Sequence, residues 1–123
     1  MRGLFITFEG TDGVGKTTQA ALLAETLQAK KHDVVLTREP GGTPLGQVLR
    51  QVLLGEMASQ DPLTWEAEVL LLAADRAQHV ARVIRPALER GAIVVCDRYL
   101  ESSLIYQGYA ADHSLEKVRD VNE

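Results

Sequence analysis

The segment between residues 4 and 31 constrains the fold of this chain more than any other. The apolar run at residues 4–8 (LFITF) predicts a buried strand, and apolar residues at helical spacing after residue 16 predict a helix. Between them stands the sequence GTDGVGKT at residues 10–17. This spacing of glycines, lysine and threonine between a strand and a helix is typical of a phosphate-binding P-loop. We therefore expect an α/β domain that binds a nucleoside triphosphate.

Each part of such a loop has a physical task. Glycines allow the tight turn that points successive N–H groups at a phosphate chain, and the start of the following helix adds a positive partial charge. The Lys16 ammonium group is expected to reach the β- and γ-phosphates. The Thr17 hydroxyl is expected to contact a magnesium ion.

Composition and charge limit the function classes. No linker or repeat is visible in the 123 residues, so we assign residues 1–123 to a single domain. The net charge of −4 and the absence of a Lys/Arg cluster argue against nucleic acid as a partner. No apolar stretch of membrane-spanning length and no signal peptide is visible, so no membrane partner is expected. The single cysteine, Cys96, is expected to be a buried strand residue and fits a reducing, cytoplasmic compartment.

Strands and helices alternate along the rest of the chain. We expect strands at 34–38 and 92–97, a loop at 40–42, a helix at 45–54, an exposed polar segment at 55–61, a long helix from Asp61-Pro62 to Arg82, a break or kink at Pro86, a helix end at Gly91, and helices at 102–109 and from 115 onward. This alternation predicts a parallel sheet flanked by helices.

Charged residues stand where each expected strand ends. Ligands of open parallel sheets gather at the carboxyl ends of the strands, which here carry Glu9, Arg38-Glu39 and Asp97-Arg98. Asp97 follows an apolar run, the position from which a carboxylate holds Mg²⁺ in P-loop proteins, although a helix-capping role is the alternative. Arg38 and Arg98 suggest a second anionic substrate, and ion pairs with Glu39 or Asp97 are their alternative role.

Four sequence blocks together resemble the bacterial thymidylate kinase family. They are EGTDGVGKTT at 9–18, TREPGGTPLG at 37–46, LLLAADRAQH at 70–79, and DRY at 97–99 followed by SS at 102–103 and YQG at 106–108. The resemblance spans about residues 4 to 109. It implies a P-loop NTPase-type sheet and transfer of the γ-phosphoryl group of ATP to dTMP with Mg²⁺, giving dTDP and ADP. It also implies a homodimer.

The resemblance assigns roles to individual residues. Catalytic residues are Lys16, Arg38 and Arg98. ATP-binding residues are Gly10, Thr11, Asp12, Gly13, Val14, Gly15, Lys16, Thr17 and Thr18. Residues that bind dTMP are Asp12, Arg38, Leu72, Arg76, Arg98, Ser103, Tyr106 and Gln107. Metal-holding residues are Thr17, Asp97 and Glu39.

Within the acceptor site, the family pattern implies a task for each side chain. Arg98 would grip the acceptor phosphate, and Arg38 would bridge toward the transferred group. Arg76 would hydrogen-bond the thymine edge while Leu72 packs against the base. Tyr106 would exclude a ribose 2′-hydroxyl. His32, His79 and His113 show no metal-ligand spacing and receive no role.

Two departures from the family pattern bear on substrate and activity. Leu72 stands where the family usually has an aromatic ring, so dUMP is an alternative acceptor. The P-loop lacks an arginine, as in members whose lid supplies one, and the sequence ends at Glu123 before a lid or adenine-binding region. We therefore expect an incomplete, weakly active chain. Two further functions stay open, a non-catalytic nucleotide-binding module and an ATPase that drives a partner protein, and Arg76 and Arg98 disfavour the ATPase.

Overall fold

The computed structural model describes residues 3–10 and 14–99. Its elements in chain order are β1 (Leu4–Gly10), α1 (Val14–Ala29), β2 (Val34–Glu39), α2 (Pro44–Leu54), α3 (Met57–Gln60), α4 (Trp65–His79), the π-helical turn η1 (Val80–Ile84), α5 (Arg85–Glu89) and β3 (Ile93–Tyr99). The helices expected at 102–109 and beyond 115 lie outside the described residues. None of the helices in the described part is long and apolar enough to cross a membrane.

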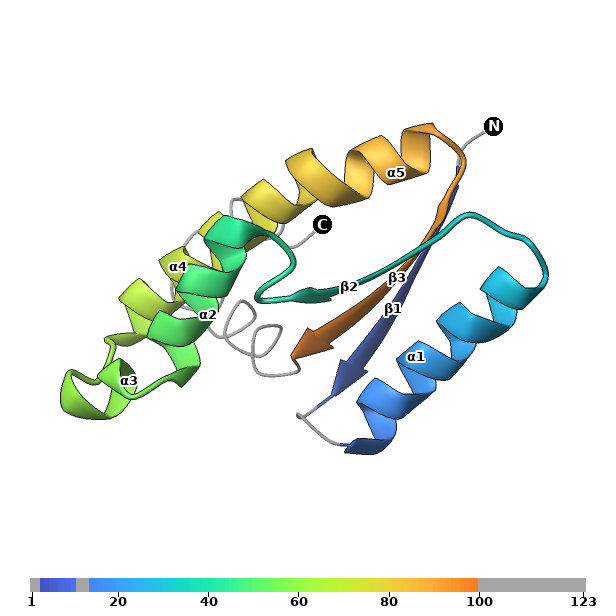
Figure 1. Ribbon diagram of the computed structural model, residues 1–123. Helices are drawn as coiled ribbons and strands as arrows, with labels where there is room; N and C mark the ends of the chain where they lie inside the picture. The colour runs from blue at the N-terminus through green and yellow to red at the C-terminus, as the bar shows by residue number, and fades with distance from the viewer. Residues whose placement is uncertain (1–2, 11–13, 100–123) are drawn as a thin grey trace.

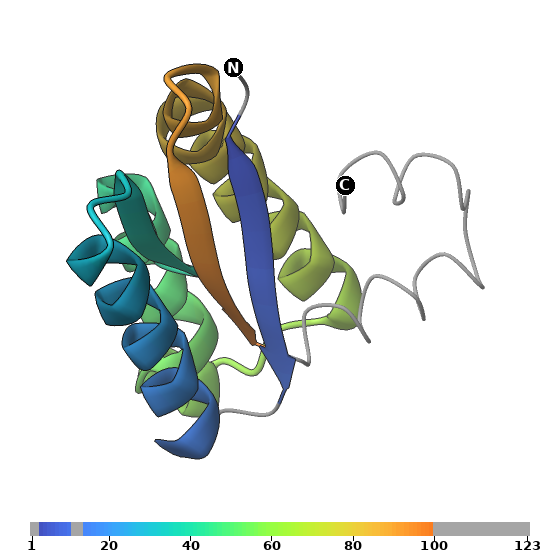
Figure 2. The same ribbon diagram turned by 90° about the vertical axis from the view of Figure 1, so that its right-hand side faces the viewer.

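The three described strands form one parallel sheet in the order β1-β3-β2. Helix α1 covers one face, and the continuous run α4–η1–α5 covers the other (Figures 1 and 2). Helices α2 and α3 lie beside α4, near the carboxyl ends of the strands (Figure 1). The predicted alternation of strands and helices around a parallel sheet is therefore confirmed.

Two apolar clusters hold the layers together. Ala20 and Ala24 of α1 pack against Val95 of β3, as the spacing of apolar residues on this helix predicted. On the opposite face, Ile84 and Ala87 pack against Val94. Strand β3 is buried from both sides because it is the central strand, which suits the apolar run at residues 93–96. The neighbouring Cys96 is fully buried in this strand, as expected.

The start of the long helix was predicted wrongly. Helix α4 begins at Trp65, and the side chain of its N-cap residue, Thr64, accepts a hydrogen bond from the Ala67 N–H. Asp61 instead follows α3, a single helical turn within the segment expected to be polar and exposed, and its backbone N–H bonds to the Met57 carbonyl. Pro62 therefore lies in the connection between two helices.

The irregularity expected near Pro86 is present, but it is not a break. The chain continues from α4 through the π-helical turn η1 into α5, and the Arg85 N–H bonds to the Val80 carbonyl, five residues back. Proline has no N–H and crowds the preceding turn of an α-helix, so a widened turn just before it relieves that conflict. The helix then ends before Gly91, which has φ of 88°.

Candidate active site

The pleat of the sheet sorts the charged strand ends onto two faces. Arg38 lies opposite Asp97 in the β2–β3 register. One residue further, Glu39 lies opposite Arg98, which also lies opposite Glu9 of β1. Because successive side chains of a strand point to opposite faces, Arg38 and Asp97 lie on the α1 face. Glu9, Glu39 and Arg98 lie on the α4 face.

A cavity of about 320 Å³ opens on the α1 face at these strand ends. Arg38 and Asp97 line it together with Gly41 and Gly42 of the loop after β2 and with Ala21 of α1. Arg38 is exposed and forms no ion pair with any residue in the described ranges, so its alternative role of a pair with Glu39 or Asp97 is not realised. For Arg98 the same alternative is realised, because its Nε atom lies 3.3 Å from Glu39 Oε1. The cavity thus combines a guanidinium group and a carboxylate beside the helix that follows the P-loop.

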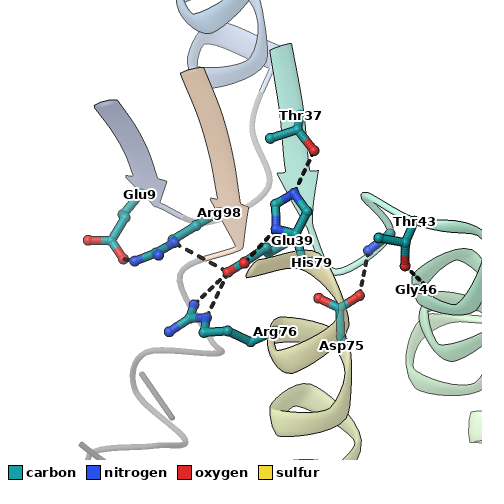
Figure 3. A network of polar contacts seen from close by, with 10 residues as sticks. Glu9, Thr37, Glu39, Thr43, Gly46, Asp75, Arg76, His79 and Arg98 are labelled. Carbon is teal, nitrogen blue, oxygen red and sulfur yellow. Dashed lines mark hydrogen bonds and ion pairs between the residues drawn. The ribbon is translucent and has the colours of Figure 1, made fainter. Parts of the chain in front are cut away.

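On the α4 face, Glu39 is the centre of a charged network (Figure 3). Its Oε1 atom lies 2.7 Å from Arg76 Nη2, 2.9 Å from Arg76 Nε and 3.3 Å from Arg98 Nε. Arg98 Nη1 also lies 3.7 Å from Glu9 Oε1. Glu39 and Arg76 are almost completely buried. Two arginines from different elements are thereby brought to one carboxylate.

Electrostatics favour the ionised form of this carboxyl group. Burial alone raises the pKa of Glu39, but a hydrogen bond from His79 and the charges of Arg76 and Arg98 outweigh it and lower the pKa to about 2. Glu39 is therefore a carboxylate throughout the physiological pH range.

His79 is the residue of this network that sequence reasoning missed. It is fully buried, with Nδ1 2.6 Å from Glu39 Oε2 and Nε2 2.7 Å from the Thr37 hydroxyl. Its helical spacing from Leu72 and Arg76, both buried on α4, was the available signal. That shared face was visible in the sequence, but its contact with β2 was not.

Further contacts fix the loop between β2 and α2. The buried Asp75 carboxylate accepts a hydrogen bond from the Gly41 N–H at 3.0 Å, and burial raises its pKa. Arg50 Nη1 donates to the Pro40 carbonyl at 2.9 Å. The Thr43 hydroxyl caps α2 by accepting from the Gly46 N–H at 2.8 Å. Hydrogen bonds with α4 and α2 therefore fix the loop that places Gly41 and Gly42 at the cavity.

The other predicted site residues are only partly described. Strand β1 ends at Gly10 and helix α1 begins at Val14, which confirms that the motif stands between a strand and a helix. The backbone of Gly15, Lys16 and Thr17 lies in the first turns of α1, and Thr18 follows with an exposed side chain. Six predicted residues lie outside the described ranges: Thr11, Asp12, Gly13, Ser103, Tyr106 and Gln107.

One cluster in the described residues has metal-ligand chemistry. Candidate ligand atoms of Glu39, His79 and Cys96 lie within 4.8 Å of one another. However, both ring nitrogens of His79 are already hydrogen-bonded, and two guanidinium groups adjoin Glu39. Burial and the charge of Glu39 also raise the pKa of Cys96 to about 12, which disfavours the thiolate that a metal would need. We interpret the cluster as a hydrogen-bonded network.

Comparison with known proteins decides the family. A sequence model described as thymidylate kinase matches residues 8–123. The chain is a member of the thymidylate kinase family. Thymidylate kinase from an Exiguobacterium species is 53% identical over the whole chain, which covers 57% of that protein. Thymidylate kinase from a Synechococcus species is 57% identical over 97% of the chain, which covers 56% of that protein.

A solved structure agrees with the family assignment. The crystal structure of thymidylate kinase from Ehrlichia chaffeensis matches with a TM-score of 0.80 and 41% identity, covering 99% of this chain and 67% of that one. The expected P-loop NTPase-type fold is thereby confirmed. The chain spans a little more than half the length of the curated thymidylate kinases it matches.

Proposed function

We propose that the protein phosphorylates dTMP with ATP, as its membership of the thymidylate kinase family suggests. The observation that carries the proposal is the convergence of Arg76 and Arg98 on Glu39 at the carboxyl ends of the strands. Besides compensating the charge of Glu39, two guanidinium groups at the carboxyl ends of the strands suit an anionic acceptor, which an ATPase acting without an acceptor would not need.

The acceptor would lie along the α4 face. Arg98 would bind the 5′-phosphate of dTMP, Arg76 the thymine edge, and Leu72, which shares a buried helix face with Arg76, the face of the base. Asp12 would meet the deoxyribose 3′-hydroxyl. The opposite wall would come from Ser103, Tyr106 and Gln107, with Tyr106 excluding a ribose 2′-hydroxyl.

The donor would lie at the P-loop. Lys16 and the backbone N–H groups from Gly10 to Thr18 would hold the ATP phosphates. Arg38, exposed in the cavity of the α1 face, would reach toward the transferred phosphoryl group. Phosphoryl transfer depends on positioning and charge neutralisation, and the acceptor is already a phosphate oxygen, so no side chain has to act as a strong base.

We propose Mg²⁺ as the metal, held by Thr17 and Asp97. The Asp97 carboxylate lines the cavity beside Arg38, and oxygen ligands are the ones that Mg²⁺ prefers. When bound, the ion would neutralise charge on the donor phosphates. We do not extend this role to Glu39, because both of its oxygens already contact cationic or hydrogen-bonding nitrogens.

The test is ADP formation from Mg-ATP with no acceptor, with dTMP and with dUMP. We expect turnover that requires dTMP. We also expect Arg98→Ala to reduce it by raising the KM for dTMP. Losing a charge-assisted contact of this kind costs about tenfold or more. Turnover with dUMP alone would favour a uridylate acceptor, and turnover independent of any monophosphate would favour the ATPase. Nucleotide binding without turnover would favour a non-catalytic module.

We also propose a homodimer in the cytoplasm, without nucleic acid or a membrane as partners. Large exposed apolar side chains occur on α2 and on the two helices that contact it, α3 and α4: Leu45, Val48 and Leu54 on α2, Met57 on α3 and Leu70 on α4. Exposed apolar residues in such number favour a protein surface as their partner. The net charge of −4 and the buried single cysteine support the remaining points.

A further inference from the structure

His79 makes two hydrogen bonds, both to side chains of β2 that point to the same face of the sheet. Thr37 and Glu39 are two residues apart, and the imidazole ring of α4 spans the distance between them (Figure 3). The ring is fully buried, so neither hydrogen bond competes with water. The two hydrogen bonds and the burial together fix the orientation of the His79 ring.

The chemistry of Glu39 determines which ring nitrogen carries a proton. With its pKa lowered to about 2, the carboxylate can only accept hydrogen bonds, so His79 Nδ1 must be the donor. In the neutral ring, Nε2 is then the acceptor for the Thr37 hydroxyl. The two contacts are thus chemically matched to one tautomer.

Gly42 supports this arrangement through the absence of a side chain. A Cβ atom at Gly42 would lie 2.6 Å from His79 Nε2 and 2.7 Å from the Arg38 carbonyl oxygen. Neither atom could yield easily, since one belongs to a buried ring and the other to the backbone of β2. The loop after β2 therefore approaches the ring as closely as glycine permits.

The two carboxylate oxygens of Glu39 contact different partners. Oε2 faces His79, whereas Oε1 contacts both Arg76 and Arg98. The last torsion of a glutamate side chain is broad, so a carboxylate held at one oxygen only can rotate. His79 stops that rotation and leaves Oε1 directed at the two guanidinium groups.

We propose that His79 is a positioning residue for the acceptor site. It fixes the Glu39 carboxylate, and that carboxylate in turn fixes Arg76 and Arg98 where they meet the monophosphate substrate. This inference rests on the proposed function for its consequence in catalysis. Its local claim, a proton on Nδ1 bonded to Glu39, stands on the contacts alone.

Three variants test the proposal by kinetics. In His79→Asn the amide N–H can replace the Nδ1 donor to Glu39, whereas His79→Gln reaches toward Thr37 and His79→Ala replaces neither contact. We expect the Gln and Ala variants to raise the KM for dTMP about tenfold, the typical worth of a hydrogen bond to a charged group, with the KM for ATP nearly unchanged. The Asn variant should recover most of the loss. His32→Ala, at an exposed histidine, is the control.

A general loss of structure would look different. It would raise the KM for both nucleotides, or lower kcat and melting temperature alike in all three His79 variants, and either pattern would overturn the proposal. So would an unchanged KM for dTMP in His79→Ala.

A second measurement does not depend on turnover or on a variant that folds. Nitrogen-15 NMR of the wild-type imidazole should place the proton on Nδ1, and a proton on Nε2 alone would refute the local claim. If wild-type protein does not phosphorylate dTMP but the proton is on Nδ1, the proposed function fails and the positioning of Glu39 stands.

Discussion

Glu39 lies where the charges of the described site are most concentrated. It contacts Arg76, Arg98 and His79 while almost completely buried. A buried charge is tolerated only when partners compensate for the lost hydration, and here three of them do. The same compensation ties the stability of the fold to the ionisation of one side chain.

The first prediction concerns acid stability. Because the pKa of Glu39 is about 2 in the folded state and 4.5 ordinarily, its stabilisation is complete above pH 4.5 and is lost as the pH falls toward 2. The shift corresponds to about 3 kcal/mol. Asp75, whose pKa is raised, acts in the opposite direction and offsets part of this slope.

Glu39→Gln provides the measurement. Urea unfolding at a series of pH values should show that the variant is less stable than wild type at neutral pH, because two buried arginines lose their counter-charge. Between pH 4.5 and 2, the free energy of unfolding should fall less in the variant than in wild type. The exposed Glu25→Gln serves as control. An acid slope in Glu39→Gln as steep as in wild type would contradict this account.

At the scale of single elements, the N-terminus of α4 is where the expected and the observed helix start differ most clearly. Two residues three positions apart, Asp61 and Thr64, are both good helix-capping types. The structure uses Thr64, whose hydroxyl accepts from the Ala67 N–H at 3.1 Å, and places Asp61 after α3. Glu66 and Glu68 in the first turn add favourable charge near the start of the helix.

The second prediction follows from this difference. Thr64→Ala should lower the free energy of unfolding by about 1 kcal/mol, the typical value of an N-cap hydrogen bond. Asp61→Ala should change it by a few tenths at most, because the Asp61 side chain caps none of the helices in the described part of the chain. Chemical denaturation measures both. A larger loss of stability in Asp61→Ala than in Thr64→Ala would contradict this account and would favour a helix that starts at Asp61-Pro62.

Sequence reasoning succeeded where signals are local and failed where they are not. Helix α2, the buried face of α1 and the convergence of charged strand ends followed from spacing and turn residues. The choice of Thr64 over Asp61 depends on how α3 and α4 pack, which propensity does not encode. The role of His79 depends on its contacts with Glu39 and Thr37, which precede it in the sequence by 40 and 42 positions.

At the scale of the whole molecule, strand order decides which charges meet. The sequence predicted that the three carboxyl ends lie at one edge, but three similar apolar runs give no basis for choosing the central strand. With β3 in the centre, Arg98 lies between Glu9 and Glu39. Another order would have separated them.

The third prediction concerns self-association. Leu70 on α4 is 65% exposed and belongs to the helices whose apolar residues we propose for the dimer, whereas Leu22 on α1 is 55% exposed on the other side of the sheet. Leu70→Glu should shift sedimentation from dimer toward monomer, because a charge would be buried in the interface. Leu22→Glu should leave the dimer intact. A wild-type monomer, or an effect of Leu22→Glu alone, would refute the assignment of this surface.

The alternation of side chains at the end of β2 also limits how such a gene can change. Arg38 belongs to the cavity beside α1, and its neighbour Glu39 belongs to the network against α4. Deleting or inserting one residue within β2 would send each of them to the opposite face, so a positive charge would enter the buried network. Substitutions alter one contact at a time, but a change of length would exchange both sites at once. The length of β2 is therefore constrained as tightly as the identity of the two charged residues at its end.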